Sequence, residues 1–166
     1  MITSEYVRIM ARYNEWQNKS TYEAASLLSD EDRFKDQGAF FGSIHCTLSH
    51  LLWGDQIWMH RFADTPKPQA DGIQASAEMI LDWKELCKER KSFDDVILNW
   101  SSSLTNQDLE GDLMWYSGAA KRDVIKPIGF LVTHMFNHQT HHRGQVHAMV
   151  TSCGGKIDDT DLFFLE

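Results

Sequence analysis

The chain has 166 residues, of which 42% are hydrophobic, and this is enough for the packed core of one ordinary domain spanning residues 1–166. Its formal net charge of −8 argues against binding to nucleic acid or to an anionic membrane through bulk electrostatics, because such binding depends on clustered Lys and Arg. Met1 is followed by neither a basic region nor a long apolar stretch, so we expect a cytoplasmic protein without a membrane span. Three widely spaced cysteines fit no disulfide framework and are expected to be reduced thiols.

Hydrophobic periodicity predicts three long helices in the first two thirds of the chain. The first covers about residues 4–28, where apolar side chains recur at intervals of three and four. The second covers about residues 40–62 and ends before a loop rich in Pro, Asp and Gly. The third covers about residues 75–103 and contains no Pro or Gly. This spacing is typical of helices that pack one apolar face against each other.

The last third of the chain begins with a change of pattern. Residues 109–124 combine glycines with short apolar runs, which indicates a small hairpin or an irregular crossover. A fourth helix is predicted over 127–152, because Pro127 suits a first helical turn and glycines follow residue 152. The apolar tail 161–166 is expected to pack on the bundle. We therefore predict an all-α fold, an up-down-type four-helix bundle with a small irregular or hairpin insertion before the last long helix.

Histidines are concentrated in the predicted fourth helix. The chain has eight, and four of them lie in the nine-residue segment HMFNHQTHH. At about 100° per residue, His142 lies within the inward apolar stripe of the helix and His138 lies at its edge, whereas His134 and His141 face its flank. Two histidines at positions i and i+4 can direct both imidazoles to a single metal ion. The pair His138 and His142 therefore predicts part of a metal site.

A third ligand has to come from another helix, and the predicted second helix offers His45, His50 and His60. His50 lies mid-helix and has the small residues Thr47 and Gly54 about one turn away on either side. Small neighbours provide room for a metal with bound water and substrate, although they also serve close helix packing. The alternative is a metal-free bundle in which the inward histidines are core side chains bonded to carbonyls or carboxylates.

Three segments resemble the DinB/YfiT-like family of four-helix-bundle proteins. NHQTHHRGQV (137–146) resembles the signature of the family, while ARYNEWQNK (11–19) and SIHCTLSHLLWGDQIW (43–58) resemble its first and second helices. The resemblance implies a bundle that is usually a homodimer, with a three-histidine site for one divalent ion, nickel, zinc or a similar metal. One histidine comes from the second helix and an HxxxH pair from the last long helix. The matching positions in this sequence are His50, His138 and His142.

Three neutral imidazoles leave a divalent ion with at least one open coordination position, as in catalytic rather than structural zinc sites. A metal in such a site can lower the pKa of bound water to about 7, polarise a carbonyl or stabilise a thiolate. Hydrolysis and thiol-dependent transfer, each on a small molecule, are therefore both open as functions. The resemblance suggests the second function as well, because relatives of this family include thiol-dependent transferases and isomerases, but no residue in the sequence decides between the two.

The alternative function is that of a non-catalytic metal-binding module in a stress response or a scaffold. The sequence identifies no general base and no other catalytic residue. Four polar residues are candidates for contacts with the ligands from the side away from the metal. These candidates are Asp55, Asn14, Tyr13 and Tyr116.

Overall fold

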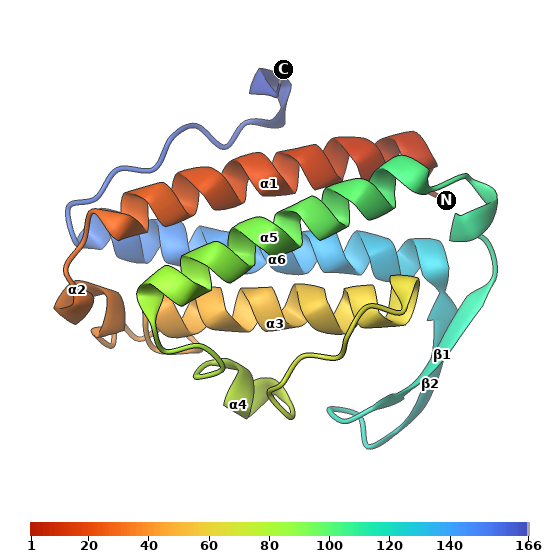
Figure 1. Ribbon diagram of the computed structural model, residues 1–166, viewed down its shortest axis with the longest axis horizontal. Coiled ribbons are helices and arrows are strands. Elements are labelled where there is room, and N and C mark those ends of the chain that lie inside the picture. Colours follow the sequence, from red (N-terminus) through yellow and green to blue (C-terminus); the bar gives the residue numbers. More distant parts are fainter. Residues whose placement is uncertain (166) are drawn as a thin grey trace.

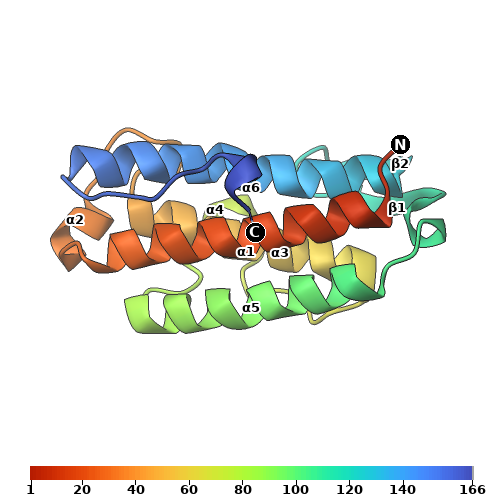
Figure 2. The same cartoon turned by 90° about the horizontal axis from the view of Figure 1, so that it is seen from above.

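Four long helices dominate the computed structural model, which describes residues 1–165. They are α1 (Ser4–Ser26), α3 (Ile44–Ala63), α5 (Trp83–Ser103) and α6 (Ile128–Ser152), and they pack lengthwise (Figure 1). The helices α1 and α3 each contact both α5 and α6. Figure 2 shows the same bundle from above, with α1 between α5 and α6. No helix in residues 1–165 has the length and apolar character needed to cross a membrane.

The predicted all-α four-helix class is wrong, because residues 1–165 contain six α-helices and a sheet. The additional helices are the short α2 (Asp30–Phe34) and α4 (Ile73–Ser76). The sheet consists of β1 (Asp112–Ser117) and β2 (Arg122–Pro127), which pair antiparallel from Asp112 opposite Pro127 to Ser117 opposite Arg122. Two 3-10 turns, Gln107–Leu109 and Leu162–Phe164, complete the regular structure.

The sheet is a hairpin between α5 and α6, and the side chains of β1 alternate between two environments. Leu113 and Trp115 are half-buried and pack on the hydrophobic cluster at this end of the bundle. Met114 and Tyr116 point the other way and are largely exposed. This two-residue period is the reason that the segment forms a strand rather than a helix, whose apolar face would repeat about every 3.6 residues.

The predicted third helix is interrupted. The chain forms α4, leaves the helical conformation after Ser76 and begins α5 at Trp83. Asp82 starts α5 by accepting a hydrogen bond from the backbone N–H of Glu85 at 2.8 Å. Met79 and Ile80 pack on the core cluster from the non-helical linker. Their apolar side chains therefore mimic helical periodicity without forming a helix.

The C-terminal segment differs from the prediction that it packs on the bundle. Ile157 is buried, and the backbone of the next few residues is bonded to α1. Beyond them Leu162, Phe163 and Phe164 are exposed, with Phe163 at 79% and Phe164 at 51%. The prediction is thus wrong for this part of the tail, and residue 166 lies outside the described residues.

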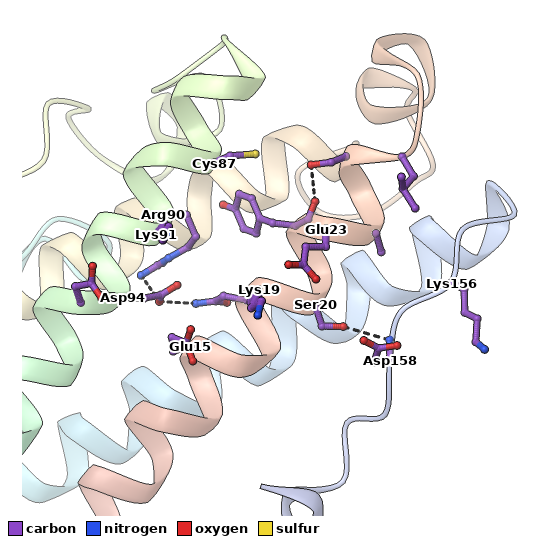
Figure 3. A pocket seen from close by; sticks show the side chains of 16 residues that line it. Glu15, Lys19, Ser20, Glu23, Cys87, Arg90, Lys91, Asp94, Lys156 and Asp158 are labelled. Atoms are coloured by element: carbon purple, nitrogen blue, oxygen red, sulfur yellow. Dashed lines mark hydrogen bonds and ion pairs between the residues drawn. The ribbon is translucent and has the colours of Figure 1, made fainter. Parts of the chain in front are cut away.

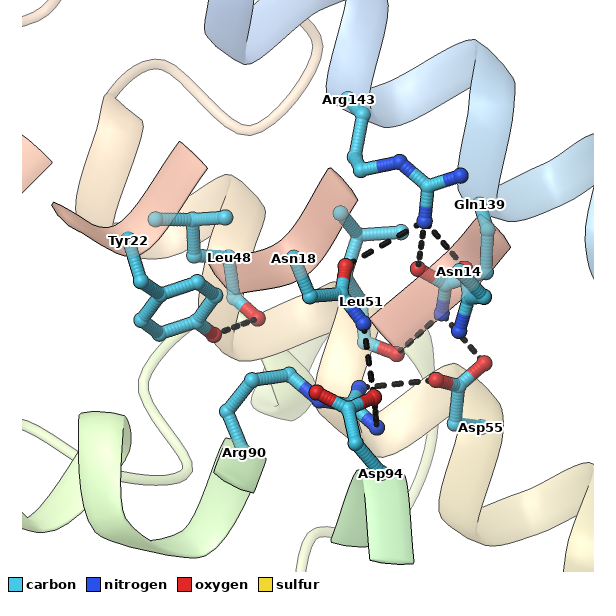
Figure 4. A network of polar contacts seen from close by, with 10 residues as sticks. All are labelled: Asn14, Asn18, Tyr22, Leu48, Leu51, Asp55, Arg90, Asp94, Gln139 and Arg143. Atoms are coloured by element: carbon cyan, nitrogen blue, oxygen red, sulfur yellow. Dashed lines mark hydrogen bonds and ion pairs between the residues drawn. The ribbon is translucent and has the colours of Figure 1, made fainter. Parts of the chain in front are cut away.

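A buried polar network connects the four long helices (Figure 4). Its centre is Arg90 of α5, which donates to Asp55 of α3 at 2.7 Å and forms an ion pair with Asp94 at 2.9 Å. Asn18 of α1 also donates to Asp94 at 2.8 Å. Burial raises the pKa of Asp94 to about 6, although the neighbouring Arg90 opposes this shift. These contacts supply the partners that buried charges require.

The second half of the network joins α6 to α1 and α3. Arg143 donates to Asn14, and to Gln139 at 3.1 Å. Gln139 in turn donates to Asp55 and to the carbonyl of Leu51 at 3.3 Å. Leu51 and Gln139 directly follow His50 and His138 in the chain. The network therefore fixes α6 against α3 at the level of the histidines.

Candidate metal centre

The three histidines predicted as ligands converge between α3 and α6. His50, His138 and His142 each offer a ring nitrogen, and these three atoms all lie within 4.8 Å of one another. The ring centroids are 5.1 Å apart for His50 and His138, 5.0 Å for His50 and His142, and 4.6 Å for His138 and His142. His50 and His142 are buried, whereas His138 is partly exposed. The cluster can therefore hold a metal ion close to the surface of the bundle.

Hydrogen bonds orient two of the three rings. Nδ1 of His50 lies 2.7 Å from Oγ of Ser76, and Nδ1 of His142 lies 2.8 Å from Oε1 of Gln145. The amide oxygen of Gln145 can only accept, so the Nδ1–H of His142 donates to it. A neutral imidazole carries one N–H, and Nε2 of His142 is then the unprotonated nitrogen. This is the tautomer that metal coordination through Nε2 requires.

The distance between the ring nitrogens of His50 and His138 fits ligands of one divalent ion. Nε2 of His50 and Nε2 of His138 are 3.1 Å apart. Two imidazole nitrogens that each lie about 2.1 Å from one ion are separated by about 3.0 Å at a right angle and about 3.4 Å at the tetrahedral angle. The observed distance lies between these values. The donor set, three imidazoles from two helices, also matches the ligands that zinc, nickel and related ions accept.

The space for His138 comes from a glycine. A Cβ atom added at Gly54 of α3 would lie 2.9 Å from Cε1 and 3.3 Å from Nδ1 of the His138 ring. From the sequence, this small residue was expected to leave room for water and substrate, but the imidazole of His138 itself occupies that room. On the other side, Phe41 stacks on His50 with ring centroids 3.9 Å apart. The backbone of α3 at Gly54 and the ring of Phe41 thus cover the cluster on these two sides.

All three imidazoles are neutral at neutral pH. Burial, reinforced by the neighbouring His142, lowers the pKa of His50 to about 3. Burial and the surrounding histidines lower the pKa of His138 to about 3 as well. Burial also lowers the pKa of His142, against a smaller opposite effect of its bond to Gln145. A neutral imidazole has the lone pair that a metal needs, so these side chains are ready to bind without first losing a proton.

The residues proposed to lie behind the ligands have other partners. Asp55 belongs to the buried ion pair with Arg90. Asn14 accepts from Arg143, and the hydroxyl of Tyr13 donates to the carbonyl of Thr160 at 2.6 Å. Tyr116 lies on the hairpin and is 66% exposed. The residues that contact the ligands instead, Ser76, Gln145 and Phe41, were missed because two of them lie in loops or short elements whose path the sequence does not reveal.

The other histidines take separate positions. His45 and His60 of α3 donate to the carbonyls of Ile80 at 2.8 Å and Thr65 at 2.6 Å. On α6, His134 is exposed and packs edge-on against Trp58 with centroids 5.2 Å apart, and His141 is exposed. Helical phase alone therefore distinguished the pair at 138 and 142 from its neighbours.

Comparison with known proteins identifies the family of this chain. The family model described as "DinB family" matches residues 1–166. The chain belongs to the DinB family. It is also 25% identical to Protein DinB of Bacillus subtilis (strain 168) over 162 residues, which cover 95% of this chain and 92% of that protein.

A solved structure supports the fold of this DinB family member. A crystal structure of a DinB-like protein from Bacillus cereus superposes with a TM-score of 0.63 and covers 86% of this chain and 89% of that one. The two sequences are 15% identical, so this likeness concerns the fold alone. The predicted family is thus confirmed.

A cleft away from the histidines is lined in part by Asn18, Arg90 and Asp94 of the polar network. It has a volume of about 620 Å³ and lies between α1 and α5, with the C-terminal segment at one end (Figure 3). Its lining includes Tyr22 and Cys87 together with lysines and acidic residues. A smaller cleft of about 370 Å³ lies near the hairpin and is lined by Trp100 and Leu113 among others. Neither cleft is lined by a histidine.

Proposed function

We propose that this DinB family protein binds one divalent metal ion, zinc or nickel, through His50, His138 and His142. The observation that supports this most directly is the convergence of three ring nitrogens within 4.8 Å, two of them on rings whose Nδ1 atoms have hydrogen-bond partners. The low pKa values of His50 and His138 remove the competition with protons at neutral pH.

The proposed activity is that of a metal-dependent enzyme, a hydrolase or a thiol-dependent transferase, which acts on a small molecule. A divalent ion bound by three neutral imidazoles keeps its full charge and an open position, and it supplies Lewis acidity toward water, a carbonyl or a thiol. His138 is the partly exposed member of the cluster, so approach from solvent is proposed on its side. The buried rings of His50 and His142 exclude water from the opposite side.

The alternative function is that of a metal-binding module without turnover. The two functions differ in whether metal-loaded protein accelerates a reaction. We therefore compare the reaction rates of metal-loaded and metal-free protein with two kinds of substrate. These are activated esters and amides, and low-molecular-weight thiols together with an electrophile. Rate acceleration by the loaded form alone supports the enzyme, and equal rates support the module.

Metal binding itself is tested by elemental analysis of protein purified without chelators or a His tag. We expect about one zinc or nickel ion per chain in the wild type and a loss of most of it in His50→Ala. The matched control is His147→Ala, because His147 lies on α6 outside the cluster. Equal metal content in wild type and His50→Ala would show that the ligand assignment is wrong.

A further inference from the structure

The segment between α3 and α5, residues 64–82, lies along α3 and is bonded to it repeatedly. Five side chains on α3 make hydrogen bonds to this linker, which runs past the cluster of three histidines. Four of them are bonded to backbone carbonyls, and these are His45 to Ile80, Ser49 to Ser76, Trp53 to Ala70 and His60 to Thr65. The fifth is His50, which is bonded to the side chain of Ser76 instead. The linker therefore places one hydroxyl directly behind a proposed metal ligand.

The direction of the proton in this contact follows from the second bond of the hydroxyl. Oγ of Ser76 donates to the carbonyl of Ile73 at 2.6 Å. A carbonyl oxygen can only accept, so the single hydroxyl proton of Ser76 is used there. Toward His50, Oγ can then only accept, and Nδ1 of His50 is the donor at 2.7 Å. The remaining nitrogen of His50, Nε2, is left unprotonated and faces Nε2 of His138 at 3.1 Å.

We propose that Ser76 is a positioning residue for His50, which selects the Nδ1–H tautomer and directs the Nε2 lone pair toward the metal. Ser76 is fully buried, so water does not replace its hydroxyl. A histidine ligand that donates its second N–H to a fixed acceptor is oriented and becomes more basic, and loss of such a partner typically weakens metal affinity 10- to 100-fold. This inference rests on the proposed metal binding and adds a residue outside the three ligands.

Two readings of Ser76 have to be separated, because the residue also anchors the linker through its backbone. Ser49 donates to the carbonyl of Ser76 at 2.8 Å without contacting the ligands by a hydrogen bond. The variant Ser49→Ala thus weakens the anchoring but leaves the Nδ1 contact in place. Ser76→Ala removes the contact with His50, and Ser76→Thr retains a hydroxyl. A purely structural role predicts that Ser49→Ala and Ser76→Ala behave alike.

The test has one readout on metal and one on the metal-free protein. Zn²⁺ affinity is measured by competition with a chromophoric chelator, and we expect a 10- to 100-fold loss in Ser76→Ala but less than about threefold in Ser49→Ala, with partial recovery in Ser76→Thr. In metal-free wild type, ¹⁵N shifts of the His50 ring should report a protonated Nδ1 and a bare Nε2, and Ser76→Ala should shift this balance.

Four results would count against the proposal, and they differ in what else they overturn. If Ser76→Ala binds Zn²⁺ as tightly as wild type, or if Nε2 of His50 is protonated in the metal-free wild type, the role of Ser76 is refuted and metal binding stands. If Ser49→Ala loses as much affinity as Ser76→Ala, Ser76 only anchors the linker. If wild type binds no Zn²⁺, both the proposed function and the role of Ser76 are refuted.

Discussion

Replacement of Gly54 by alanine should separate the stability of the fold from the binding of metal. In a helix interior, alanine is favoured over glycine by about 1 kcal/mol, so α3 alone predicts a more stable protein. The new Cβ, however, would lie 2.9 Å from Cε1 of His138, where ordinary contacts are 3.4–4 Å. The ring therefore has to move by about half an ångström, whereas metal–ligand distances tolerate about 0.2 Å. We expect Zn²⁺ affinity to fall at least about tenfold, which corresponds to about 1.4 kcal/mol.

The assay combines chelator competition with thermal unfolding of the metal-free protein. The matched control is Gly144→Ala on α6, because a Cβ at this helical glycine meets no atom within 4 Å. The control should gain the helix propensity and retain wild-type Zn²⁺ affinity. Wild-type affinity in Gly54→Ala would refute the reasoning, since it would mean that the His138 ring is not confined by α3 in the way described.

Three further predictions concern pH, the polar network and the aromatic cover. Zn²⁺ affinity should fall less than about fourfold from pH 8 to pH 6, because the pKa values of His50 and His138 are already about 3. Three ordinary imidazoles would lose about 65-fold in affinity over this range, and a steep loss in a pH-jump titration would contradict the prediction. Arg90→Met leaves Asp55 and Asp94 without their cation and should lower the free energy of unfolding in urea by about 3–5 kcal/mol. The control at the exposed Arg12, Arg12→Met, should lower it by less than about 0.5 kcal/mol, and a loss below about 1 kcal/mol in Arg90→Met would refute the importance of the ion pairs. Phe41→Ala uncovers His50 and should speed Zn²⁺ release to excess chelator several-fold, and an unchanged release rate would show that the ring does not control access.

Part of the candidate site was predictable because it depends on local geometry. His138 and His142 are one helical turn apart, and the phase of the apolar residues on the same helix shows that they face inward. The choice of His50 over His45 and His60 needed the family resemblance, since phase within a buried helix does not identify a partner on another helix. The contacts from Ser76 and Phe41 depend on how loops cross α3, and no local pattern encodes such a path.

The errors in the predicted fold have a similar origin. Met79 and Ile80 are apolar because the linker packs on the core, and the same spacing reads as helix when the chain is considered alone. Phe163 and Phe164 are apolar but exposed, which composition cannot distinguish from packing. The start of the last helix was more predictable, because Pro127 acts through the adjacent backbone and α6 begins at Ile128. The start of α5 at Trp83 was expected near residue 75 instead.

The most direct test of the central claim is a crystal structure of protein loaded with Zn²⁺ or Ni²⁺, with anomalous diffraction recorded at the absorption edge of the metal. We expect one anomalous peak per chain, about 2.1 Å from Nε2 of each of His50, His138 and His142. A peak bound elsewhere, or loaded crystals in which these three rings share no ion, would contradict the account.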